Sequence, residues 1–208
     1  MIKYNSILVI EPHPDDFMSC FSTLSRLRRN NPDCKIYDYY ACPCTEDPKN
    51  INHIEDHTKV LKLLNIEPIC GHHPRNGWID DYKQKFRDEM HLLKNKINPE
   101  LVFCSTPHDF HQDHKAISEC IMTIFRCNST ILGYEVMRSV MPDFTPNLFF
   151  IIEKEDYDLK MKAINMYKSQ VKHRYFFNQE KYSAQMIMRG IQFETPYAEA
   201  YELIWGKF

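Results

Sequence analysis

The sequence predicts a three-layer α/β fold, Rossmann-like in outline, with a mainly parallel sheet and helices on both faces. Short apolar runs alternate with amphipathic helical patterns, which is the order that a parallel sheet with crossover helices requires. Hydrophobic residues make up 43% of the 208-residue chain, enough for a sizeable core. The chain has no internal repeat and no Gly/Ser linker, so we expect residues 1–208 to form a single domain.

Six apolar runs, rich in Ile, Val, Leu, Phe and Tyr, are the expected strands. They cover residues 6–10, 35–41, 67–70, 101–105, 131–137 and 147–152. The clearest helix is expected over residues 82–97, where apolar side chains recur at steps of three and four before Asn98-Pro99 ends the pattern. Similar apolar stripes predict helices over residues 54–64 and 116–124.

The composition excludes several classes of protein. A formal net charge of −2 argues against a nucleic-acid binder held by bulk charge. The N-terminal apolar stretch is too short for a signal peptide and no later run approaches a membrane span, so we expect a cytoplasmic protein. The eight cysteines complete no zinc-knot spacing, and we expect reduced thiols. Those in apolar runs, and therefore expected in the core, are Cys20, Cys70, Cys104, Cys120 and Cys127.

Two clusters of His and Asp follow predicted strands. One is the segment PHPDD at residues 12–16, and the other is HDFHQDH at residues 108–114. Ligands bind beyond the carboxyl ends of the strands in an open parallel sheet, so both clusters stand where chemistry is expected. Neither contains a Gly-rich phosphate loop, which favours a metal over a dinucleotide.

The spacing within the clusters suits a catalytic metal site. Pro12 and Pro14 delay the next helix until about Asp15, which places Asp15 and Asp16 in its first turn. Two imidazoles and one carboxylate make a typical catalytic zinc set, and hydrolysis needs a further base and a polarising group. The alternative is that an aspartate merely caps the helix and that each histidine only makes hydrogen bonds.

The two motifs together resemble the LmbE/PIG-L family of zinc-dependent N-deacetylases. PHPDD after an N-terminal strand and HQDH at residues 111–114 carry the resemblance, and YKSQ, RG and YAEAY at residues 167–170, 189–190 and 197–201 follow the family's late pattern. Members remove acetyl groups from N-acetylglucosamine units on small carriers, including glycosylphosphatidylinositol precursors and the sugar precursors of mycothiol and bacillithiol. The resemblance implies a small-molecule N-acyl amino sugar or glycoconjugate as substrate, and no nucleic-acid partner.

The resemblance also assigns roles to individual residues. The metal ligands are expected to be His13, Asp16 and His114. Asp15 matches the general base that deprotonates the zinc-bound water, and His111 matches the residue that polarises the amide carbonyl, stabilises the oxyanion and can protonate the departing amine. Asp113 matches the acidic partner that orients or charges His111. A His₂Asp set with open positions suits Fe²⁺ as well as Zn²⁺, so either divalent metal is expected.

Two departures from the family pattern lie beside the first motif. Phe17 stands where the family usually has Glu, and Glu11-Pro12 stands where a small residue is common. Neither position is a ligand or the base, so we expect the chemistry to survive, the surroundings of the site to be rearranged and Phe17 to pack inward. No arginine lies between Arg29 and Arg75, where relatives acting on small glycosides often carry one, so a phosphoinositide-like aglycone is not expected.

Substrate contacts are predicted less directly. The loop at residues 71–80 offers Arg75, Asn76 and Trp78, and Arg189 and Glu199 are weaker candidates whose alternative role is an ordinary surface ion pair. Two alternatives to N-deacetylation stay open: hydrolysis of another N-acyl group such as N-formyl, and a non-catalytic sugar- or metal-binding relative. A homo-oligomer is compatible with the sequence.

Overall fold

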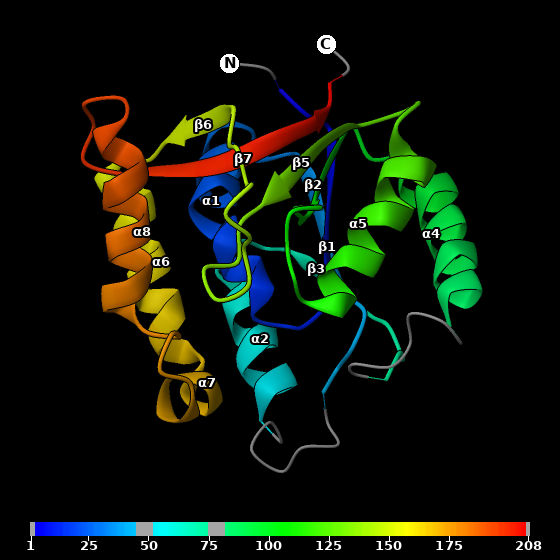
Figure 1. Cartoon of the computed structure of the whole chain (residues 1–208), viewed down its shortest axis with the longest axis horizontal. Coiled ribbons are helices and arrows are strands. Elements are labelled where there is room, and N and C mark those ends of the chain that lie inside the picture. The colour runs from blue at the N-terminus through cyan, green and yellow to red at the C-terminus, as the bar shows by residue number, and fades with distance from the viewer. Residues whose placement is uncertain (1–2, 45–51, 75–81, 207–208) are drawn as a thin grey trace.

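A computed structural model describes residues 3–44, 52–74 and 82–206 of the chain (Figure 1). Seven strands form one sheet in the order β3-β2-β1-β4-β5-β7-β6. The strands are β1 (Ser6–Glu11), β2 (Lys35–Tyr40), β3 (Glu67–Cys70), β4 (Leu101–Ser105), β5 (Thr130–Tyr134), β6 (Leu148–Ile151) and β7 (Ala198–Trp205). Strands β1 to β5 run parallel to one another, and β7 runs antiparallel between β5 and β6. The predicted α/β class with a mainly parallel sheet is confirmed.

Helices cover both faces of the sheet. The helical segments are the 3₁₀ turn η1 (Asp16–Ser19), α1 (Phe21–Asn30), α2 (His53–Lys62), α4 (Lys83–Ile97), α5 (Gln112–Phe125), α6 (Lys154–Met166), α7 (Lys168–His173) and α8 (Gln179–Ile191). Helices α4 and α5 pack together on one face, and α1, α2, α6 and α8 lie on the other (Figure 1). None of the helices in the described ranges is long and apolar enough to cross a membrane.

The alternation of side chains along β1 divides the interior into two cores. Ile7 and Val9 belong to the cluster beneath α1, α2 and α6, whereas Leu8 and Ile10 belong to the cluster beneath α4 and α5. All four side chains are buried because successive residues of a strand point to opposite faces. Burial on both faces explains why the central strand is a continuous apolar run.

Two predictions about the interior need correction. The strand β7 was not among the six predicted, because Glu199 and Glu202 interrupt its apolar pattern; both are buried and accept hydrogen bonds inside the protein. Cys70 and Cys127 are exposed and not in the core, since Cys70 lies on the edge strand β3 and Cys127 follows the end of α5. All eight thiols are free in the structure.

Candidate active site

The two His/Asp clusters meet at the carboxyl edge of the sheet because β1 and β4 are direct neighbours. The turn after β1 differs in one respect from the prediction. Asp15 and Asp16 open a separate four-residue 3₁₀ turn, η1, and α1 begins only at Phe21. Asp15 occupies the N-cap position of η1, but its side chain makes no capping hydrogen bond. Capping therefore does not account for this carboxylate.

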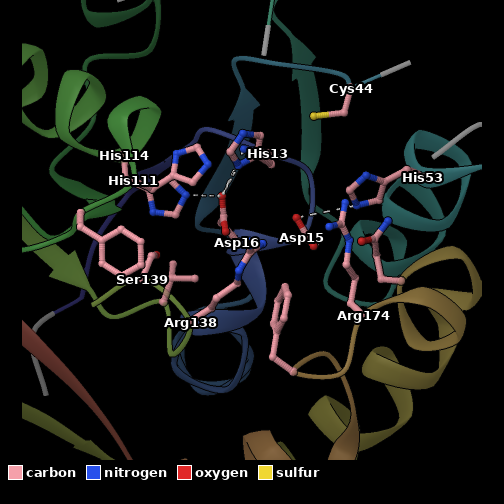
Figure 2. Close-up of a pocket in the computed structure, with 14 residues that line it drawn as sticks. His13, Asp15, Asp16, Cys44, His53, His111, His114, Arg138, Ser139 and Arg174 are labelled. Atoms are coloured by element: carbon pink, nitrogen blue, oxygen red, sulfur yellow. Dashed lines mark hydrogen bonds and ion pairs between the residues drawn. The ribbon is translucent and has the colours of Figure 1, made fainter. Parts of the chain in front are cut away.

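Three donor atoms converge as a metal centre requires (Figure 2). Asp16 Oδ2 lies 3.1 Å from His13 Nδ1 and 3.3 Å from His114 Nε2. Two ligand atoms bound tetrahedrally at about 2.0–2.1 Å from an ion are about 3.3 Å apart, so both separations suit a shared small divalent cation. Ligand atoms of His13, His111 and His114 also lie within 4.8 Å of one another. His13, Asp16 and His114 are all buried, and the three side chains come from the two predicted motifs. Their proximity supports the predicted ligand role.

Each candidate imidazole ligand has a carboxylate behind it. Asp113 Oδ2 lies 3.2 Å from Nε2 of His13, and Asp109 Oδ2 lies 2.7 Å from Nδ1 of His114. Such carboxylate–histidine pairs fix the tautomer and orientation of metal-binding rings. Asp113 was predicted to orient His111. Its carboxylate lies against His13, and its backbone N–H donates a hydrogen bond to His111 Nδ1.

Asp109 is a functional candidate that the sequence reasoning missed. It is fully buried, it accepts hydrogen bonds from the His111 backbone N–H at 2.8 Å and from the Ser139 hydroxyl at 2.9 Å, and it holds His114. The signal was present, since Asp109 stands inside the HDFHQDH cluster. The spacing alone could not show which of the two aspartates in that cluster would face which ring.

The electrostatics of the cluster favour a bound cation. Burial by itself raises the pKa of the Asp16 carboxyl, but the imidazoles of His114 and His13 outweigh burial and hold that pKa well below its usual range. Burial lowers the pKa of His114, yet the carboxylates of Asp16 and Asp109 prevail and raise it to about 10. A divalent ion placed between these groups would replace the proton that the carboxylates otherwise attract to the ring.

His111 is held in a defined tautomer. It is the N-cap of α5, and its Nδ1 accepts a hydrogen bond of 3.2 Å from the backbone N–H of Asp113. Burial, together with the neighbouring His114 and His13, lowers the pKa of His111 to about 4, so the ring is neutral at neutral pH. A neutral ring that accepts at Nδ1 carries its proton on Nε2. His111 can therefore donate a hydrogen bond from Nε2.

Asp15 and His53 line the same pocket as the candidate ligands (Figure 2). His53 Nε2 lies 3.8 Å from Asp15 Oδ1, and no hydrogen bond within the described part of the chain engages the Asp15 carboxylate. His53 is only 2% exposed, and neither of its ring nitrogens has a hydrogen-bond partner among the described residues. A buried polar group without a partner is costly, which marks His53 as a second residue that the sequence reasoning missed.

A buried network supports the turn from behind. Tyr167 donates a hydrogen bond of 2.9 Å to the Pro14 carbonyl, and its hydroxyl oxygen lies 2.6 Å from His57 Nδ1. His57 Nε2 in turn lies 2.8 Å from Asp38 and 3.2 Å from Glu11. His57 therefore links Tyr167, which supports the Pro14 carbonyl, to two buried carboxylates.

The same network explains the two departures beside the first motif. The Glu11 carboxylate accepts a hydrogen bond of 2.5 Å from the backbone N–H of Phe17. Phe17 is fully buried and packs edge-to-face against His57. The predicted inward packing of Phe17 is therefore confirmed. Position 17, where the family usually has glutamate, is phenylalanine in this chain. Glu11 supplies a carboxylate behind the same turn.

Two of the predicted substrate residues, Arg189 and Glu199, lie away from this pocket. Arg189 forms a two-pronged ion pair with Glu135, and Glu199 is 4% exposed and holds Lys160 at 2.6 Å. Both Arg189 and Glu199 line a different, smaller cavity, so they do not form the surface pair proposed as their alternative. The remaining candidates, Arg75, Asn76 and Trp78, lie outside the described residues.

The fold and the site together define a Rossmann-like α/β protein with a candidate metal centre at the carboxyl edge of its sheet. The model of the PIG-L family, described as GlcNAc-PI de-N-acetylase, matches residues 8–125, which is more than half of the chain. The chain therefore belongs to the PIG-L family, as its motifs predicted. It is also 28% identical to the uncharacterized deacetylase YaiS of Escherichia coli (strain K12) over 183 residues, covering 80% of this chain and 92% of that protein.

Solved structures with this fold differ in their chemistry. The N,N'-diacetylchitobiose deacetylase from Pyrococcus horikoshii, complexed with an inhibitor, aligns with a TM-score of 0.76 at 18% identity over 96% of this chain and 83% of its own. The 4-carboxy-2-hydroxymuconate hydratase GalB from Pseudomonas putida KT2440 aligns with a TM-score of 0.74 at 14% identity over 98% of both chains. The fold is therefore shared by deacetylases and a hydratase, and the reaction must be argued from the site.

Proposed function

We propose that this protein is a metal-dependent hydrolase that removes the N-acetyl group from an amino sugar or small glycoconjugate. Its membership of the PIG-L family supports deacetylase activity. One structural observation supports the proposed mechanism. His13 Nδ1, Asp16 Oδ2 and His114 Nε2 converge beside a carboxylate, Asp15, that no described hydrogen bond engages. This combination of a ligand set and a free base in one pocket is what amide hydrolysis requires.

The candidate ligands would hold Zn²⁺ or Fe²⁺. When bound, such an ion acts as a Lewis acid on the amide carbonyl and lowers the pKa of water towards about 7. Asp113 and Asp109 orient the His13 and His114 rings for this role through contacts of 3.2 and 2.7 Å. Asp16 stays ionised, because the two imidazoles hold its pKa low.

Asp15 and His111 supply the proton transfers and the polarisation. Asp15 takes the proton of the attacking water, which its position in the pocket and its lack of a capping bond allow. His111 donates from Nε2 to the carbonyl oxygen as negative charge develops there, because its Nδ1 is committed to the backbone of α5. The proton on Asp15 is then available to the departing amine.

Release of the acyl group from defined substrates tests this proposal. Metal-depleted protein is reconstituted with Zn²⁺ or Fe²⁺ and incubated with N-acetyl and N-formyl derivatives of glucosamine, and acetate, formate and free amine are quantified. We expect metal-dependent release of acetate. Preferential release of formate would replace N-acetyl by N-formyl as the substrate class. Metal binding without release of any acyl group would instead favour the non-catalytic relative.

A further inference from the structure

Two arginines line the pocket that holds the candidate metal centre. Arg138 lies in the segment between β5 and β6, and Arg174 follows α7 directly. In Figure 2 both side chains extend from the pocket wall towards the region of Asp15 and Asp16. Neither arginine belongs to the two metal-site motifs, and nothing in the proposed hydrolysis of the amide uses them.

The guanidinium groups of these two arginines are not neutralised by the protein. No ion pair or side-chain hydrogen bond joins either group to a carboxylate within the described residues. Other arginines of the chain are engaged: Arg29 lies 2.7 Å from Asp156, and Arg189 lies 2.6 Å from Glu135. The pocket arginines therefore keep their hydrogen-bond donors available.

The carboxylates near the pocket do not pair with the two arginines. Asp16 lies between His13 and His114, and its charge belongs to the candidate metal centre. Asp15 Oδ1 lies 3.8 Å from His53 Nε2. Asp109 and Asp113 lie against His114 and His13. None of these four carboxylates pairs with Arg138 or Arg174, so both guanidinium groups can bind an anionic ligand group.

Arg138, an exposed residue, contacts an aromatic ring at the pocket. Its guanidinium carbon lies 5.3 Å from the ring centroid of Phe176, which also lines the pocket. Phe176 is two residues after Arg174, so this contact joins the segment after β5 to the segment after α7. A cation over an aromatic face is attracted to the ring while its outer N–H groups remain free to donate.

We propose that Arg138 and Arg174 form an anion-binding subsite, and that the substrate carries a phosphate or carboxylate group in addition to its N-acyl group. This inference rests on the proposed function and names the substrate class of the same pocket. Guanidinium groups bind phosphate and carboxylate oxygens through paired, charge-assisted hydrogen bonds. A neutral amino sugar leaves both groups without a partner, so the anionic substrate is preferred.

Kinetics on matched substrates test the subsite. The substrates are N-acetylglucosamine, its 1-phosphate, its 6-phosphate and N-acetylmuramic acid, which separate phosphate from carboxylate and one attachment point from another. We expect kcat/KM to be at least about tenfold higher for one of the anionic substrates than for N-acetylglucosamine, as a charge-assisted contact allows. The variants Arg138→Gln and Arg174→Gln should each reduce this preference by about tenfold, with the loss mainly in KM.

Lys172→Gln is the matched control, because Lys172 is an exposed cation on α7 that does not line the pocket. It should leave the preference unchanged. Equal kcat/KM for neutral and anionic substrates, or a preference that survives both arginine variants, would overturn the subsite while leaving the deacetylase intact.

Binding of the products separates failure of the subsite from failure of the proposed function. Calorimetric titration with glucosamine 6-phosphate, glucosamine 1-phosphate, muramic acid and glucosamine requires no turnover. We expect one of the anionic amines to bind at least about tenfold more tightly than glucosamine, with the difference lost in Arg174→Gln. If no acyl group is released but this difference in affinity is found, the anion-binding subsite is supported and the proposed deacetylase activity is wrong. If all four amines bind equally, the subsite is wrong.

Discussion

At the residue scale, two adjacent aspartates have different surroundings. Asp16 is 8% exposed and lies against two imidazoles, whereas the Asp15 side chain is 15% exposed and is engaged by no hydrogen bond within the described residues. Both carboxylates line the pocket, but only Asp16 lies within 3.3 Å of imidazole nitrogens. These surroundings support the proposed roles of Asp16 as ligand and Asp15 as base.

Removing the charge of Asp15 should abolish catalysis and leave the metal bound. Asp15→Asn keeps the shape of the side chain but cannot accept the proton of water, so kcat should fall by about 10²–10⁴-fold. Metal content, measured by mass spectrometry of the purified protein, should stay at the wild-type level. Asp33→Asn, at an exposed aspartate far from the motifs in sequence, is the control. A fully active Asp15→Asn enzyme would remove Asp15 from the mechanism.

Asp109 should act through His114. Asp109→Asn weakens the hydrogen bond to Nδ1 of that ring, and loss of such a support costs about 10–100-fold in metal affinity. The measurement is a competition between the protein and a chelator of known affinity. Asp143→Asn, which removes an exposed carboxylate paired with His108, should leave the affinity unchanged. An unaltered affinity in Asp109→Asn would show that this carboxylate only supports the loop.

Replacing His53 by leucine should raise the stability of the protein and lower its activity. Its two ring nitrogens are buried without hydrogen-bond partners among the described residues, so His53→Leu removes a desolvated polar group and should raise the free energy of unfolding by about 1 kcal/mol. The same change should lower kcat/KM, because an imidazole beside Asp15 is lost from the pocket. Denaturant unfolding and steady-state kinetics check the two effects. Loss of stability with unchanged kcat/KM would give His53 a purely structural role.

At the scale of elements, the apolar patterns predicted the five parallel strands of the sheet. Buried β1 and β4 have continuous apolar sequences, and the helix predicted over residues 82–97 matches α4 (Lys83–Ile97). The strand β7 could not be predicted in this way, because its glutamates are buried by tertiary partners. Glu199, for example, accepts hydrogen bonds from Thr23 and Lys160, which lie far from it in the sequence. No local pattern reveals such partners.

Glu199 connects β7 to the start of α1. Its carboxylate accepts hydrogen bonds from the backbone N–H groups of Ser22 and Thr23, at 3.1 and 2.8 Å, and pairs with Lys160. Glu199→Gln leaves a buried ammonium group without its counter-charge, which should cost about 3–5 kcal/mol of unfolding free energy. Chemical denaturation measures this loss.

A double variant separates the structural role of Glu199 from a role in substrate binding. Lys160→Met in the Glu199→Gln background removes the unpaired charge and should recover part of the lost stability. KM of the folded protein should stay near the wild-type value in both variants. A raised KM with unchanged stability would instead support the substrate role predicted from the sequence.

At the scale of the whole molecule, topology brings the site together. The two motifs are far apart in the sequence, but their strands are neighbours and end at the same edge of the sheet. This rule allowed the two His/Asp clusters to be predicted as one site from strand ends. The resemblance to the PIG-L family then assigned the candidate ligands within them. The pocket arginines were not predictable, because Arg138 and Arg174 reach the same edge from irregular or short segments that no periodic pattern marks.

The central claim is that one divalent ion, held by His13, Asp16 and His114, supports N-deacetylation. Its most direct test is titration of metal-depleted protein with Zn²⁺ or Fe²⁺ while acetate release from the preferred N-acetylated substrate is measured. We predict that activity rises to a plateau at one equivalent of metal in the wild-type protein and is absent at every ratio in His114→Ala. Equal activity in metal-depleted and reconstituted protein, or an active His114→Ala variant, would contradict the account.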